Sequence, residues 1–93
     1  MAKYRLKLFI TGHTPRAEQA IANLDRICRE ELGGQYDMMV VDVLERPQDA
    51  EVEKIIATPT LIKELPPPLR RIIGDLSDKE KALVGLQLTP SRE

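Results

Sequence analysis

The first 43 residues fit few folds, because a strand, a long helix and a second strand follow one another closely. Tyr4 to Thr11 begins with alternating apolar and basic residues and ends as a continuous apolar run, which is typical of a strand. Apolar residues then recur every three or four positions from 17 to 32, which predicts an amphipathic helix. Thr14-Pro15 supplies its start and Gly33-Gly34 its stop. The mostly apolar segment 36–43 predicts a second strand that is internal or nearly so, and the three segments together predict a right-handed βαβ unit.

Prolines divide the rest of the chain. Pro47 opens a short helix whose apolar residues extend to Ile56. The segments 60–65 and 69–73 are short enough for strands, and the proline run between them predicts a hairpin. Gly74-Asp75 ends the second of these strands. Ser77 to Glu80 then forms a capping box, which predicts a helix to about Leu88 that is weakened by Gly85.

The predicted order is therefore βαβαββα, an α/β fold with the thioredoxin-like arrangement, in a single domain over residues 1–93. In such folds a proline before the third strand is commonly cis and faces the start of the first helix. Thr58-Pro59 fits that description, and it equally fits a trans proline that simply begins a strand.

Composition excludes several classes of function. The net charge of −1, from 14 basic and 15 acidic residues, argues against a nucleic-acid-binding domain. One cysteine and one histidine give no disulfide framework and no metal site, so we expect no metal and no cofactor. No apolar run is long enough to cross a membrane and no secretion signal is present, so we expect a soluble, cytoplasmic protein without a membrane partner.

No catalytic residue emerges from the sequence. A thioredoxin-like oxidoreductase holds a pair of cysteines after its first strand, but segment 11–15 here reads Thr-Gly-His-Thr-Pro. Cys28 lies on the apolar stripe of the first helix, which predicts a core position. His13 is either an ordinary turn residue or an anion-binding group or base at a helix start, without a recognisable partner carboxylate.

Four segments carry a resemblance to the KaiB family of cyanobacterial clock proteins. They are LKLFITGHTP (6–15), VVDVLERPQDAE (40–51), KIIATPTLIKELPPPLRRIIGDLSDKEK (54–81) and the following LVGLQL. The resemblance implies a non-enzymatic regulator that binds the N-terminal ATPase ring of KaiC, a hexameric kinase and phosphatase, and so modulates its phosphorylation cycle and output. It also implies capture of KaiA and displacement of a clock-output histidine kinase.

The family is further known for fold switching, which leaves two folds to choose between. A tetrameric ground state, ordered βαββααβ, rearranges its C-terminal half into a thioredoxin-like monomer that binds KaiC. We expect the monomeric form here, since the chain has few aromatic residues for self-association and no acidic tail after Glu93. The candidate fold-switch or cis-proline residues are Pro59, Pro66, Pro67, Pro68, Gly74 and Asp75.

The resemblance also implies a set of partner-binding residues, namely Lys7, Lys54, Lys63, Arg70 and Arg71. Adjacent strand residues point to opposite faces, so only one of the two arginines is expected to face a given partner. Clock relatives often carry a basic residue where this chain has Gln19 and Met39, which makes KaiA capture the weakest part of the expectation.

Two other functions stay open at this point. One is a paralogue that acts in stress responses independently of KaiC. The other is a thioredoxin-like thiol enzyme that depends on Cys28. The acidic segment 42–53 and the basic segment 54–73 either steer a protein partner or simply form a solvated surface.

Overall fold

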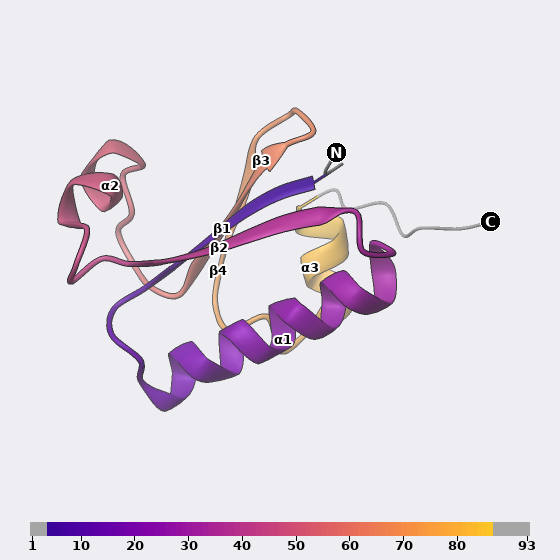
Figure 1. Ribbon diagram of the computed structural model, residues 1–93, viewed down its shortest axis with the longest axis horizontal. Coiled ribbons are helices and arrows are strands. Elements are labelled where there is room, and N and C mark those ends of the chain that lie inside the picture. Colours follow the sequence, from indigo (N-terminus) through magenta and orange to yellow (C-terminus); the bar gives the residue numbers. More distant parts are fainter. Residues whose placement is uncertain (1–3, 87–93) are drawn as a thin grey trace.

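The computed structural model describes residues 4–86, and its elements follow the predicted order (Figure 1). They are β1 (Tyr4–Ile10), α1 (Pro15–Glu31), β2 (Tyr36–Asp42), α2 (Pro47–Val52), β3 (Thr60–Leu65), β4 (Arg70–Ile73) and α3 (Lys79–Gly85). The predicted α/β class and the βαβαββα order are confirmed. Within residues 4–86, none of the helices has the length and apolar character needed to cross a membrane.

The strands form one sheet in the order β2-β1-β3-β4. β1 and β2 are parallel, from the pair Tyr4 and Tyr36 to the pair Ile10 and Asp42. β3 runs antiparallel to both β1 and β4, so that β3 and β4 form the predicted hairpin across the proline run. α1 lies along one face of this sheet, and α3 packs beside it on the same side (Figure 1).

The prediction that the second strand is internal is wrong, because β2 forms an edge of the sheet. Its side chains alternate: Tyr36, Met38 and Val40 are partly buried against the main core, whereas Asp37 and Met39 are exposed. An apolar residue, Met39, stands at a position where an edge strand usually carries a polar one, and it is 56% exposed. Because Met39 is apolar, the segment is mostly apolar, which is why the sequence predicts an internal strand.

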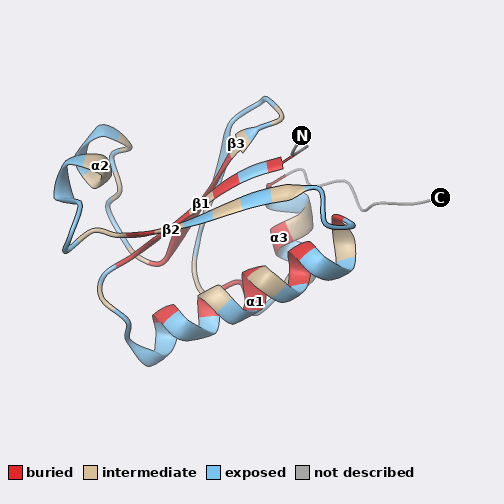
Figure 2. Cartoon of the chain, viewed as in Figure 1, coloured by how far each residue is buried: buried red, intermediate tan, exposed pale blue. Residues whose placement is uncertain are grey.

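Two clusters of buried side chains hold the sheet, one on each face. Figure 2 marks the buried positions along the strands and helices in red. The larger cluster lies between the sheet and the two helices, and it includes Leu6, Leu8 and Ile10 of β1, Leu24, Ile27 and Cys28 of α1, Leu61 of β3, and Ala82 and Leu86. The smaller cluster is formed by Phe9, Val41 and Ile62 on the opposite face, with Val43 and Ile55 packed against it. The apolar end of β1 is therefore covered on both sides.

Helix ends follow the predicted chemistry with one shift. The hydroxyl of Thr14 accepts a hydrogen bond from the backbone N–H of Ala17 at 3.1 Å, as expected for the cap of α1. The cap of α3 is Asp78 rather than Ser77, since the Asp78 carboxylate accepts from the Lys81 N–H at 3.1 Å. The predicted end at Leu88 lies outside the described residues, and the described helix ends at Gly85.

The segment between β4 and α3 is bound to α1. The side chain of Asn23, which is 3% exposed, donates a hydrogen bond to the backbone oxygen of Asp75 at 2.7 Å. The Lys79 ammonium lies 2.8 Å from a carboxylate oxygen of Glu31. Leu76 is buried with φ +63°, a left-handed conformation that these contacts maintain.

Three X–Pro peptide bonds are cis: Thr58–Pro59, Leu65–Pro66 and Pro67–Pro68. The Thr58 hydroxyl forms a hydrogen bond with that of Thr11 at 2.7 Å. The loop before β3 therefore lies beside the turn that leads into α1, as the first of the two interpretations of Pro59 required.

Candidate protein-binding surface

The sheet face opposite α1 and α3 carries charged side chains. Along β1, Leu6 and Leu8 point toward the helices, so Arg5 and Lys7 project from the other side. The strand register places Lys7 beside Met39 of β2 and Ile62 of β3, and places Arg71 of β4 beside Ile62. Lys7 and Arg71 therefore flank Ile62 on one surface, which we call the open face. A hollow of about 440 Å³ on it is lined by Arg5, Leu6, Lys7, Asp37, Met38, Met39 and Glu64.

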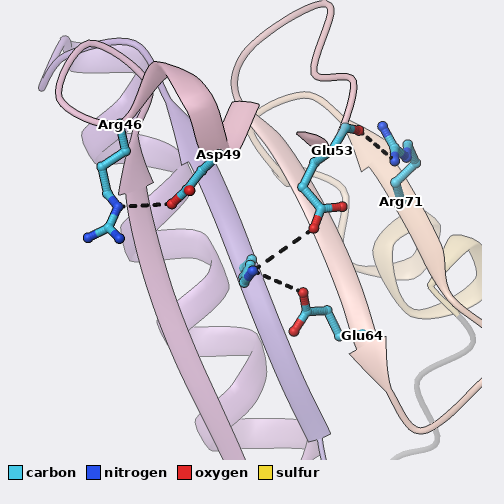
Figure 3. A network of polar contacts seen from close by, with 6 residues as sticks. Arg46, Asp49, Glu53, Glu64 and Arg71 are labelled. Atoms are coloured by element: carbon cyan, nitrogen blue, oxygen red, sulfur yellow. Dashed lines mark hydrogen bonds and ion pairs between the residues drawn. The ribbon is translucent and has the colours of Figure 1, made fainter. Parts of the chain in front are cut away.

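Four residues of the open face form a polar network (Figure 3). The Lys7 ammonium lies 3.1 Å from a carboxylate oxygen of Glu64 and 4.0 Å from one of Glu53. The Arg71 guanidinium donates to the backbone oxygens of Glu53 at 2.9 Å and of Lys54 at 3.4 Å. Because these side chains are partly exposed, each ion pair contributes at most about 1 kcal/mol to stability. The network joins β1, β3 and β4 to the connector that follows α2.

Lys54 occupies a strained turn in that connector. Its φ is +57°, in the left-handed region that residues with a side chain rarely adopt. The turn closes α2, since the Lys54 N–H donates to the Glu51 oxygen and the Ile55 N–H donates to the Ala50 oxygen. The side chain of Lys54 is exposed. Its side chain is therefore available to a partner, and it starts from a backbone position that the turn fixes.

Large apolar side chains are exposed at the end of α2 and in the segments before and after it. Leu44, Val52 and Ile56 are 68%, 78% and 88% exposed, and we call these three residues the α2 patch. They belong to the segment that extends beyond the ends of the strands at the left of Figure 1. No residue of α2 itself is buried. A groove of about 260 Å³ beside it is lined by Thr11, Val43, Ala50, Ile55, Ile56, Ala57 and Thr58.

The five predicted partner-binding residues do not lie together. Lys7, Lys54 and Arg71 meet at the open face, whereas Lys63 and Arg70 are paired across β3 and β4 on the other face. Lys63 is only 1% exposed, opposite Leu6, and burial lowers the pKa of its ammonium group. In this conformation Lys63 is not accessible to a partner. The two arginines do point to opposite faces, as strand geometry requires.

The polar groups at the carboxyl ends of β1 and β2 join loops. One carboxylate oxygen of Asp42 accepts from the backbone N–H groups of Gly12 and Leu44, both at 3.0 Å, and these bonds lower the pKa of Asp42. His13 contacts the carboxylate of Glu18 through Nδ1. The interpretation of His13 as lacking a partner carboxylate was wrong, because the helix start brings residue 18 back over the turn.

The thiol of Cys28 is not arranged for nucleophilic chemistry. It lies fully buried in the larger core cluster, and burial raises its pKa to about 12. Reactive cysteines instead have lowered pKa values and access to solvent. Among residues 4–86, no group of three or more histidine, cysteine or acidic residues is placed to hold a metal ion.

Comparison with known proteins identifies the family. The sequence model of the KaiB domain matches residues 7–88, which is most of the chain. The chain belongs to the KaiB family. The circadian clock protein KaiB3 of a Synechocystis species is 60% identical over 90 residues, which cover 97% of this chain and 88% of that protein. The circadian clock oscillator protein KaiB of Microcystis aeruginosa is 56% identical over 85 residues, covering 91% and 82%. KaiB proteins are clock regulatory proteins, and this chain is one of that family.

Solved structures with low sequence identity share the fold. The N-terminal domain of Synechococcus elongatus SasA matches with a TM-score of 0.75 at 21% identity, over 100% of this chain and 91% of that one. Mitochondrial thioredoxin 3 from Saccharomyces cerevisiae matches with a TM-score of 0.73 at 17% identity, over 94% and 79%. The thioredoxin-like arrangement predicted from the sequence is confirmed for this KaiB-family chain.

Proposed function

We propose that this chain is a non-enzymatic regulator that acts in the cytoplasm by binding the N-terminal ATPase ring of a KaiC-type protein. Through that contact it would modulate the phosphorylation cycle of the ring and its output signalling. The observation that carries the proposal is that Lys7 and Arg71 flank Ile62 on the open face, where Arg71 also donates to the backbone oxygen of the exposed Lys54. Membership of a family of circadian clock proteins supports a clock component as the partner.

The composition of this surface suits a protein partner. Interfaces between proteins combine apolar contacts with a polar rim, and the chain exposes both kinds of group: the apolar residues of the α2 patch and the charged side chains of Lys7 and Arg71. Cations at such a rim accelerate association with an acidic surface more than they add to the final affinity. The proposal therefore assigns apolar contact to Leu44, Val52 and Ile56 and steering to Lys54 and Arg71.

The binding form in this proposal is the thioredoxin-like monomer, and a tetramer with the alternative βαββααβ fold is its stored form. A clock-output histidine kinase with a thioredoxin-like sensor domain would compete for the same ring. KaiA capture has less support, because the exposed residue in the middle of the β2 edge is Met39 rather than a cation.

A second candidate is a paralogue that serves a stress response or another timing system instead of the daily oscillator, with or without a KaiC-type partner. It is favoured by the identity of 60% to the relative named KaiB3, against 55–56% to relatives named KaiB. The departures at Gln19 and Met39 point the same way. Both candidates predict a regulatory protein, and they differ in which partner it binds.

Binding to purified KaiC-type rings tests the proposal. The labelled chain would be titrated with hexamer and ATP at several salt concentrations, with Lys54→Glu and Arg71→Glu as variants and Arg26→Glu, on the exposed side of α1, as the matched control. We expect the two open-face variants to associate about tenfold more slowly and with a weaker salt dependence. If neither variant changes the association rate, the interface does not include Lys54 and Arg71. If the wild type does not bind the ring, the result favours the KaiC-independent paralogue.

A further inference from the structure

One side chain of β4 holds the turn that presents Lys54. The Arg71 guanidinium donates from one terminal nitrogen to the Glu53 oxygen at 2.9 Å and from the other to the Lys54 oxygen at 3.4 Å. These carbonyl groups lie 18 and 17 positions earlier in the chain. Within residues 4–86, these two oxygens accept their hydrogen bonds from Arg71 and not from a backbone N–H group. A contact of this span forms only when β4 is paired in place.

We propose that Arg71 is a positioning residue, which couples the conformation of the Lys54 turn to the formation of β4. This inference rests on the proposed function in one respect only, namely that Lys54 contacts the ring of the KaiC-type protein. Lys54 has φ +57°, and a non-glycine residue stays in that region only when its surroundings hold it there. The bonds from Arg71 to the two peptide groups beside this residue supply such a hold.

The chemistry of the contact requires an arginine. A guanidinium group offers several N–H donors in a fixed plane, so it can serve two successive carbonyl oxygens at once. A lysine ammonium is a single point charge on a flexible chain and does not impose the same geometry. The substitution Arg71→Lys therefore separates the effect of the positive charge, which it keeps, from the effect of the planar guanidinium group, which it removes.

The contact between Arg71 and the Lys54 turn also depends on the register of β4. Arg71 is paired with Ile62 and so projects from the open face, whereas Arg70 is paired with Lys63 and projects from the other. A shift of one residue would exchange these two side chains and remove the guanidinium from the turn. The Lys54 turn thus reports whether β4 is present in this register.

A second contact holds the same turn from β1. The Glu53 carboxylate lies 4.0 Å from the Lys7 ammonium, which is also 3.1 Å from that of Glu64 on β3 (Figure 3). The side chain of Glu53 is thereby directed to the middle of the sheet and its carbonyl to β4. The partner-binding surface is completed only when the last third of the chain has its strands, so a conformation without β4 would present Lys54 differently.

The first test uses the free protein. NMR spectra of the full chain would be compared for the wild type, Arg71→Lys, Arg71→Ala and the matched controls Arg70→Lys and Arg70→Ala. We expect both Arg71 variants to shift the carbonyl and Cα signals of Glu53 and Lys54 away from the left-handed values while the β4 signals stay strand-like. Unchanged signals at residues 53 and 54 in Arg71→Lys would overturn the inference, whatever the binding results. If Arg71→Ala does not fold, Arg71→Lys still decides.

The second test uses binding to the ring, and it separates shape from charge. Arg71→Lys keeps the charge, so a purely electrostatic role predicts wild-type affinity, whereas a positioning role predicts a loss of about fivefold, which is the size of one typical net hydrogen bond. In a Lys54→Ala background the same substitution should cost almost nothing, because the positioned cation is gone. Full additivity would contradict the coupling. Failure of the wild type to bind would refute the proposed function and leave the NMR result to judge Arg71.

Discussion

Replacing Asn23 by alanine should destabilise the fold more than any other single polar substitution in α1. Asn23 lies in the middle of the helix and is 3% exposed. Its amide nitrogen donates to the Asp75 backbone oxygen at 2.7 Å, and its amide oxygen accepts from Gln19 at 3.5 Å. The bond to Asp75 fixes the loop between β4 and α3 to α1, whose buried side chains belong to the larger core cluster.

The size of the effect follows from two opposing terms. Losing the bond and leaving the Asp75 oxygen without its donor costs about 1–3 kcal/mol. Alanine is a better helix former than asparagine and returns about 0.5 kcal/mol. The net loss is therefore about 0.5–2.5 kcal/mol. For a domain of this size it would lower the midpoint of urea unfolding by about 0.5–2 M and the melting temperature by about 2–20 °C.

Urea unfolding followed by circular dichroism measures this loss directly. Gln19→Ala is the matched control, since Gln19 is exposed on the same helix and its bond to Asn23 is long. We expect the control to stay within about 0.5 kcal/mol of the wild type, which is usual for surface substitutions. An equal loss in the two variants, or a loss below about 0.3 kcal/mol in Asn23→Ala, would refute the view that the 2.7 Å bond holds the loop.

Three further predictions concern other parts of the fold. Gly85→Ala should stabilise the protein by about 0.5–1 kcal/mol, because the added methyl group meets Ile72 at an ordinary contact distance of 3.4 Å; a lower urea midpoint would contradict it. The Cys28 thiol should react with a disulfide reagent such as dithionitrobenzoate at least about a hundred times more slowly in the native protein than in urea, since it is buried with a pKa of about 12. Native labelling at a similar rate would place it in an accessible site. Hydrogen bonds from the N–H groups of Gly12 and Leu44 lower the pKa of Asp42 in the folded state. Its contribution to stability is therefore present above its unfolded pKa, and it is lost as pH falls through the folded pKa. Asp42→Asn should accordingly be less stable than the wild type at pH 7, and urea midpoints should converge toward about pH 3; a constant gap would count against this assignment.

Most of the element order could be predicted because its boundaries are local. The cap at Thr14 and the prolines at 47, 59 and 66–68 act on their immediate neighbours, so helix and strand starts are marked in the sequence itself. The cap of α3 was misplaced by one residue because Ser77 and Asp78 are both good caps. The choice depends on the Asp75 carboxylate, which accepts from the Ser77 N–H and so uses that residue in the preceding turn.

The position of β2 could not be predicted, since strand order depends on the whole sheet. A chain segment does not indicate which strand will pair with its free side, and Met39 disguised the alternation that marks an edge. The sequence also predicts that Ile55 and Ile56 belong to the short helix, because their apolar side chains continue its pattern, but α2 ends at Val52. They lie in the connector instead, where Ile55 packs against the smaller core cluster and Ile56 is exposed.

The candidate surface was predicted in part. The alternation of β3 could have indicated that Lys63 shares a face with the buried Leu61, which the resemblance alone did not reveal. The bonds from Arg71 to residues 53 and 54 were beyond any local pattern, because they depend on the register of two strand pairs and on the path of the connector.

The place of β1 in the sheet also bears on how the chain is synthesised and folded. Its partner on one side, β2, follows after a single helix, so the first 42 residues contain a parallel pair and the helix that covers it. Its partner on the other side, β3, is made much later, and closing the longer loop is slower. During translation the N-terminal unit can therefore assemble while one edge of β1 still waits for residues 60–65. The pairing of β1 with β2 uses only residues among the first 42. A rearrangement confined to the last third of the chain would therefore break no hydrogen bond between these two strands.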